Sequence, residues 1–139
     1  MDWVSCIKNR IVKEVKIDKN LISSLIKSSA RKFRTQELFE LSNDSADSKI
    51  TLLYDSVREL LEALAISKGY KIYNHACYFS FLKEIIKKDS LAKSFNNFRI
   101  IRNSINYYGK DISLEEAKDI IEDMKKFIKI IKEDYISSI

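Results

Sequence analysis

Turn-forming residues are almost missing from this chain, and this feature most constrains how it folds. The 139 residues include no proline and only two glycines, Gly69 and Gly109. Tight hairpins depend on such residues at positions with special backbone angles, so a sheet of many short strands is disfavoured. Hydrophobic residues make up 45% of the chain and charged residues 32%, which suits one solvated domain with a real core. We therefore expect long helices joined by short polar connections.

Apolar residues recur at spacings of three and four over several long segments, as is typical of helices with one buried face. This pattern predicts helices over residues 20–41, 46–68, 75–88, 91–108 and 113–135. Asp18, Asn74 and Ser113 are the expected N-caps. Gly69 and Gly109 stand where left-handed C-terminal caps are expected.

These helices predict an all-α fold, an up-and-down antiparallel bundle of four to five helices in one domain spanning residues 1–139. Residues 1–18 carry a further amphipathic stretch, which we expect to be a docking helix or a loosely held arm. Burial of the apolar stripes, at about 25 cal/mol per Å², is the force that closes such a bundle.

Charge and cysteine content restrict the function classes. The net charge of +5 permits attraction to RNA, nucleotides or acidic partners, although a lysine-rich solvated surface is the alternative. Cys6 and Cys77 have no CxxC spacing, so we expect neither a zinc site nor a disulfide framework but buried or incidental thiols. With no long apolar run and no signal-peptide layout, we expect a cytoplasmic protein that neither crosses a membrane nor needs a cofactor or metal.

The segment RNSINYYG, residues 102–109, differs from an ordinary core helix. Arg102 falls within an otherwise apolar face, where a guanidinium must be paired or must line a cleft. Four neighbouring side chains add hydrogen-bonding groups and planar rings: Asn103, Asn106, Tyr107 and Tyr108. Arginine with tyrosine can hold a phosphate and stack a base, which makes this segment the candidate nucleotide or RNA site.

Two alternatives stay open for the charged and titratable residues. Arg102 either lines a cleft or forms an ion pair with Glu59 or Glu84 that locks the bundle. His75 is the sole histidine and lies at the start of a predicted helix. It either caps or packs that helix end, or it serves as an acid–base group that reaches the Arg102 cleft, within one subunit or across a dimer.

The order of the segments over residues 19–135 resembles the HEPN domain family (higher eukaryotes and prokaryotes nucleotide-binding). The resemblance lies in TLLYDSVRELLEALAISKGY, in KIYNHACYFSFLKEII, in the Arg-Asn and Tyr pair near the end of the next helix, and in the closing amphipathic helix. It implies a homodimer with the arginine motif at the subunit cleft. It also implies one of two roles: a metal-independent ribonuclease, often a toxin, or a partner of a minimal nucleotidyltransferase.

The nuclease motif of that family is an arginine followed, after four to six residues, by a histidine. This chain matches at Arg102 and Asn103, but Tyr107, Tyr108 and Gly109 occupy the positions of the histidine. Because a tyrosine with its usual pKa of about 10 is a poor general base, we predict a degenerate member that binds RNA, a nucleotide or a nucleotidyltransferase without cleaving RNA, in a toxin–antitoxin or defence setting. The alternative is a metal-independent endoribonuclease that uses the polar residues beside Arg102, with His75 as a further catalytic candidate. A scaffold of purely structural role is the third reading.

Overall fold

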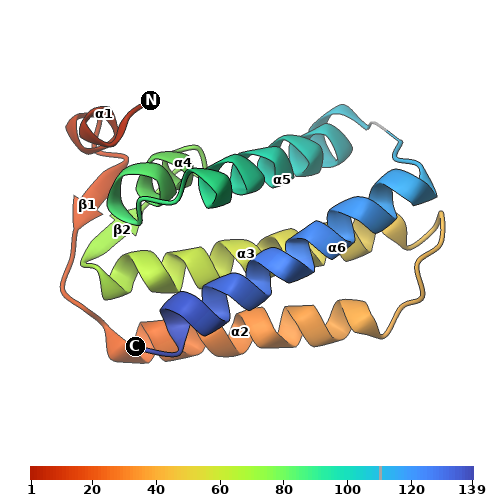
Figure 1. Cartoon of the computed structure of the whole chain (residues 1–139), viewed down its shortest axis with the longest axis horizontal. Coiled ribbons are helices and arrows are strands. Elements are labelled where there is room, and N and C mark those ends of the chain that lie inside the picture. Colours follow the sequence, from red (N-terminus) through yellow and green to blue (C-terminus); the bar gives the residue numbers. More distant parts are fainter. Residues whose placement is uncertain (110) are drawn as a thin grey trace.

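The computed structural model describes residues 1–109 and 111–139, apart from the side chains of residues 107 and 108. Four long helices form a bundle whose chain runs back and forth along the long axis (Figure 1): α2 (Lys19–Glu37), α3 (Ala46–Ser67), α5 (Asp89–Tyr108) and α6 (Leu114–Ile131). The predicted all-α class and helical bundle are confirmed at this level of detail.

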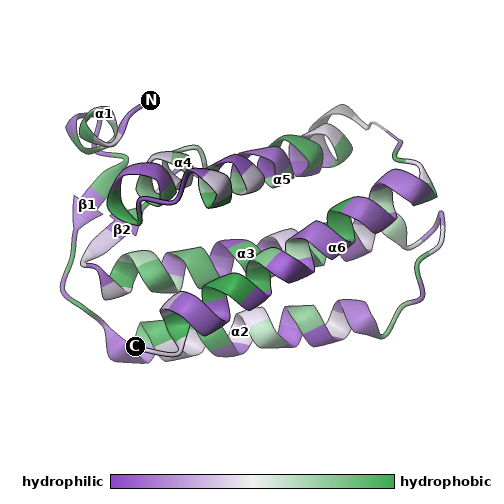
Figure 2. Cartoon of the chain, viewed as in Figure 1, coloured by the Kyte–Doolittle hydropathy of each residue, from purple (hydrophilic) through white to green (hydrophobic). Residues whose placement is uncertain are grey.

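The helix α3 lies at the centre of the bundle and contributes more of the described buried hydrophobic residues than any other helix. Leu53, Val57 and Leu61 on this helix are completely buried. The adjoining helix α6 alternates between hydrophobic and hydrophilic bands, and its apolar side contributes to the same core (Figure 2). In that core Phe98 of α5 and Phe127 of α6 meet edge to face, with ring centroids 5.5 Å apart.

The predicted helix ends are largely correct. The Asp18 carboxylate accepts a hydrogen bond from the backbone N–H of Leu21 at 3.0 Å, and Ser113 caps α6 in the same way. Gly109 has φ +62° and ψ +25°, the left-handed conformation expected of a C-terminal cap. Gly69 likewise has a positive φ of 88°, which few other residues adopt without strain.

The N-terminal segment differs from the prediction, because it is not one amphipathic stretch. It contains a short helix α1 (Trp3–Lys8) and a strand β1 (Val12–Glu14). The strand pairs in an antiparallel manner with β2 (Tyr70–Ile72), with Val12 opposite Ile72. A three-residue strand contains too few positions for an alternating pattern to be distinguished from a helical one, so sequence periodicity could not reveal it.

The expectation for the cysteines was wrong. Cys6 of α1 and Cys77 form a disulfide, with Cα atoms 6.2 Å apart, and both residues are buried. Spacing rules detect cysteines that are close in sequence, whereas these two are separated by 71 positions and meet only through the fold. Since disulfides are typical of oxidising compartments, the cysteines no longer support a cytoplasmic location.

The single helix predicted over residues 75–88 is also corrected. The structure has a short helix α4 (Cys77–Ser80) that continues as a π-helical turn, η1 (Phe81–Ile85). A second π-helical turn, η2 (Lys132–Ile136), extends α6. The spacing of apolar residues in a single π-helical turn is close to that in an α-helix, so hydrophobic periodicity does not distinguish the two.

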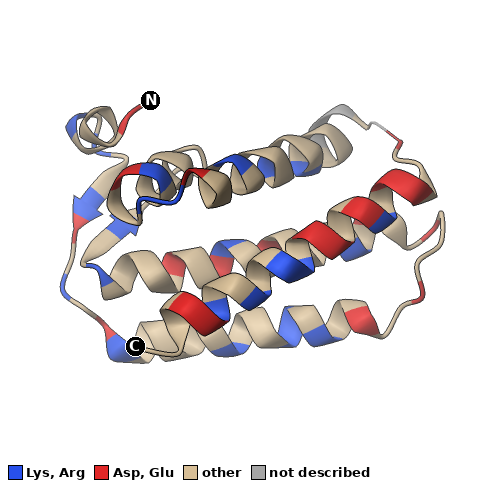
Figure 3. Cartoon of the chain, in the orientation of Figure 1, with Lys and Arg blue, Asp and Glu red and all other residues tan. Residues whose placement is uncertain are grey.

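Charged residues are distributed unevenly along α6, with acidic groups concentrated in its first half and lysines in its second (Figure 3). This arrangement complements the helix dipole, whose N-terminal end favours negative charge. Across the residues that the structure describes, no helix combines the length and the apolar character needed to cross a membrane.

Candidate functional site

The candidate site lies between α3 and α5. Residues 95, 99, 102 and 106 recur at spacings of three and four, so they share one face of α5. At the C-terminal end of this face, the side-chain oxygen of Asn106 lies 3.4 Å from the Thr51 hydroxyl of α3, at the limit of a hydrogen bond. The guanidinium carbon of Arg102 lies 5.4 Å from the centroid of the Tyr54 ring of α3, a cation–π geometry.

Tyr54 connects Arg102 to His75. Its side chain is completely buried, and its ring stacks on Phe95 of α5 with centroids 5.9 Å apart. The Tyr54 hydroxyl forms a hydrogen bond with Nδ1 of His75 at 3.0 Å. Tyr54 therefore contacts Arg102 through its ring and His75 through its hydroxyl.

Further charged groups surround this pair. Burial is the main cause that lowers the pKa of His75, and the positive charges of Arg58, Arg102 and Arg99 lower it further, against a smaller opposing effect of Asp55. The imidazole is therefore neutral at pH 7. We call Arg58, Arg99 and Arg102 the arginine cluster. Each of the three residues is partly exposed, although the Nε atoms of Arg99 and Arg102 are buried.

The Tyr54 phenol keeps its proton at neutral pH. Burial raises the pKa of Tyr54 to about 12, although the charges of Arg102, Arg99 and Arg58 act in the opposite direction. Tyr54 is thus a hydrogen-bond partner that orients His75 and not a base. Its complete burial also prevents it from stacking on a bound nucleobase.

Hydrogen bonds within the cluster involve neutral and acidic neighbours. Arg99 donates to the side-chain oxygen of Asn96 at 2.9 Å, and Arg58 lies 3.4 Å from Glu62. Glu62 also binds Lys71 at 2.5 Å, so its single charge is shared between two cations. The surplus of positive charge suits a phosphate, whose oxygens match the forked donors of a guanidinium.

The acidic partners suggested for Arg102 are bound elsewhere. Glu59 forms an ion pair with Lys32 and accepts a hydrogen bond from Ser28. Glu84 accepts a hydrogen bond from the backbone N–H of Trp3 at 2.7 Å. The alternative in which one of these two carboxylates locks Arg102 is therefore not supported.

The structure also gives the positions of the other predicted residues. Asn103 is partly buried on α5 and projects about 100° from Arg102 around the helix. The side chains of Tyr107 and Tyr108 lie outside the described residues. The prediction of Asn74 as a helix N-cap was wrong, because the N-cap of α4 is Ala76 and it makes no side-chain cap hydrogen bond. The Asn74 side chain instead accepts a hydrogen bond from the backbone N–H of Ala76 at 2.8 Å, one turn before the helix.

Sequence reasoning missed Tyr54, Arg58 and Arg99 as members of the site. Tyr54 is buried, and a buried tyrosine hydroxyl usually has a polar partner, but this rule does not identify the partner. Arg99 precedes Arg102 by three positions on the same face of α5, so its spacing was a usable signal. Arg58 lies on α3, and no spacing rule connects it with Arg102.

Comparison with known proteins leaves the family open. No protein-family model matches this chain, and no curated protein matches it. Membership of the HEPN family therefore stays a prediction from the sequence.

Proposed function

We propose that this protein binds a phosphate-bearing ligand, RNA or a nucleotide, at the arginine cluster between α3 and α5. The observation that carries the proposal is the convergence of Arg58, Arg99 and Arg102 on one Tyr54–His75 pair. Arginines supply paired donors to phosphate oxygens, and all three arginines of the cluster are partly exposed.

Binding of a fluorescently labelled RNA oligonucleotide, followed by anisotropy, tests this proposal. The Arg102→Ala variant is expected to bind roughly tenfold more weakly, because a charge-assisted contact with a phosphate is lost. Its matched control is Arg31→Ala, which removes an exposed arginine from α2 outside the cluster. The dissociation constant of the unmodified protein should rise steeply with salt concentration. Equal losses in the two variants would show that net charge alone attracts the RNA.

Cleavage of RNA is a second candidate function, and the Tyr54–His75 hydrogen bond favours it. When Nδ1 of His75 donates to the Tyr54 oxygen, the other ring nitrogen is a free acceptor for the proton of a ribose 2′-hydroxyl. The 2′-oxygen then attacks the adjacent phosphorus to form a 2′,3′-cyclic phosphate, and the bond to the 5′-oxygen of the next nucleotide breaks as that oxygen takes up a proton from water. Arg102 would stabilise the charge that develops on the phosphate oxygens.

Incubation of the purified protein with a mixed RNA pool in EDTA separates binding from cleavage. If the protein is an endoribonuclease, the RNA is cleaved, and His75→Ala and Arg102→Ala each abolish this cleavage. The control Arg31→Ala retains it. Salt-sensitive RNA binding with intact RNA in every sample would reject the nuclease and leave the binding function.

The HEPN resemblance supports two further parts of the proposal. The protein would form a homodimer with Arg102 at the subunit cleft, and it would act alone on RNA or with a nucleotidyltransferase in a toxin–antitoxin or defence system. Sedimentation velocity tests the dimer. A monomer at micromolar concentration would contradict it without affecting the RNA-binding test.

A further inference from the structure

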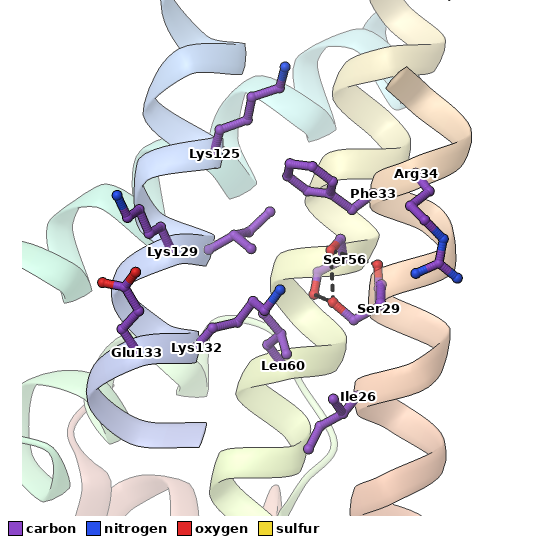
Figure 4. Close-up of a pocket in the computed structure, with 12 residues that line it drawn as sticks. Ile26, Ser29, Phe33, Arg34, Ser56, Leu60, Lys125, Lys129, Lys132 and Glu133 are labelled. Carbon is purple, nitrogen blue, oxygen red and sulfur yellow. Dashed lines mark hydrogen bonds between the residues drawn. The ribbon is translucent and has the colours of Figure 1, made fainter. Parts of the chain in front are cut away.

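A second feature of the bundle is a groove between α2 and α6, above α3 (Figure 4). It holds about 320 Å³, which is the liquid volume of about ten water molecules. Its lining residues do not include any member of the arginine cluster, so the two features are separate.

Small side chains make this groove possible. Ser29 and Ala30 of α2 and Ser56 of α3 form part of its lining. The Ser29 hydroxyl lies 2.8 Å from both the hydroxyl and the carbonyl oxygen of Ser56, and the Ser56 hydroxyl donates to the Ser29 carbonyl at 3.0 Å. These bonds hold α2 and α3 close together and satisfy both hydroxyls, so the serines do not themselves demand a polar ligand.

The walls of the groove are apolar. They are formed by one aromatic ring and three branched aliphatic side chains: Phe33, Ile26, Leu60 and Ile128. A ligand that enters between α2 and α6 therefore meets hydrocarbon on both sides. Displacement of water from such walls favours an apolar body.

Four cations are among the residues that line the groove. Lys125 and Lys129 lie on α6, Lys132 lies on the π-helical turn η2 and Arg34 lies on α2, against a single lining carboxylate, Glu133. Lys132 extends from η2 toward α3 in Figure 4, where its ammonium group lies over the groove, whereas the Lys129 side chain points away from it.

One of these cations is already held in place. Lys125 forms an ion pair with Glu37 at 2.8 Å, and its ammonium lies 6.0 Å from the Phe33 ring centroid. The remaining positive charge favours an anionic head group at the opening.

We propose that this groove binds a small amphipathic anion, with an apolar body between Phe33 and Ile128 and a carboxylate or phosphate head at Lys132. The volume sets the ligand at on the order of ten non-hydrogen atoms. Octanoate has this size and chemistry, and octan-1-ol has nearly the same apolar body without the charge.

Titration of the ¹⁵N-labelled protein with each compound, followed by backbone amide shifts, tests the assignment. Octanoate is expected to shift the amides of Ser29, Ala30 and Ile128 and to bind more tightly than octan-1-ol. The Lys132→Gln variant should weaken octanoate binding by roughly two- to fivefold, because one partly screened charge is lost, and should leave octan-1-ol unchanged.

Two matched variants make the test decisive. Lys126→Gln removes an exposed lysine of α6 that does not line the groove, and it should retain octanoate binding. Ala30→Leu fills the groove without changing charge and should abolish the binding of both compounds, with folding checked by circular dichroism. Shifts located elsewhere, equal effects of Lys126→Gln and Lys132→Gln, or full binding by Ala30→Leu would each overturn the proposal. If a short acidic helical peptide bound to the groove and octanoate did not, the groove would be assigned to a protein partner instead.

Discussion

At the scale of single residues, Tyr54 shows how one buried side chain organises the candidate site. Its ring contacts Arg102 and Phe95 of α5, and its hydroxyl reaches His75 beyond the end of α3. Sequence analysis identified Arg102 as unusual because a charge in an apolar stripe is conspicuous. It could not join Arg102 to His75, because the connecting residue looks like ordinary core and the contacts span 21 and 48 positions in the chain.

The titration of His75 leads to a prediction about stability. The pKa of His75 in the folded protein lies below its ordinary value of 6.5, mainly because the ring is partly buried. The unfolded chain therefore binds a proton more readily, and the free energy of unfolding falls as the pH drops through 6.5 toward the folded-state pKa. Below that pKa both states are protonated and the loss is complete.

Urea denaturation at a series of pH values from about 7.5 to about 5 measures this effect. Because His75 is the only histidine, the His75→Gln variant should show a flatter dependence in this window. A parallel decline in both proteins would assign the pH dependence to carboxylates instead.

At the scale of elements, the long helices were predictable and the short pieces were not. Each of α2, α3, α5 and α6 repeats its apolar spacing over many turns, so the signal accumulates. The strands and the π-helical turns extend over three and five residues and depend on hydrogen bonds between distant or shifted partners. The sequence pattern contains no information about those partners.

The end of α2 illustrates a tertiary cap that no local rule predicts. Lys49 is buried in α3, and its ammonium donates to the carbonyls of Gln36 and Phe39 at 2.7 Å each. These groups lie at or just beyond the C-terminus of α2, where carbonyls lack helical partners and the helix dipole favours a cation.

Substitution of Lys49 by methionine should lower the free energy of unfolding by about 1–3 kcal/mol, because two carbonyls lose a charged donor. Chemical denaturation measures the change. Lys93→Met, at an exposed position of α5, is the control and should shift the midpoint little. A similar stability for the two variants would mean that water replaces the Lys49 ammonium at no cost.

At the scale of the whole molecule, several contacts attach the N-terminal segment to the bundle. The disulfide joins Cys6 to Cys77, β1 pairs with β2, and the backbone N–H of Trp3 donates to Glu84. The segment therefore belongs to the folded unit, although it contains none of the four long helices. The composition indicated one domain, but only the three-dimensional arrangement shows how its first residues are held.

Removal of the disulfide by the double substitution Cys6→Ser, Cys77→Ser should lower the free energy of unfolding by about 2–4 kcal/mol, since a crosslink over a long loop restricts the unfolded chain. Denaturation of the original protein with and without a thiol reductant provides the comparison. The double variant should match the reduced protein and should not respond to reductant. Equal stability of the oxidised and reduced forms would show that the crosslink does not stabilise the bundle.

The single tryptophan gives this attachment an optical signal. Trp3 is 6% exposed, and its indole lies against Tyr70 and Phe81 with ring centroids 5.1 and 5.8 Å away. Release of the first residues would place the indole in water and move its emission to longer wavelength, while the far-ultraviolet dichroism of the long helices would change little. Fluorescence and dichroism recorded in one experiment can therefore distinguish detachment of the N-terminus from global unfolding.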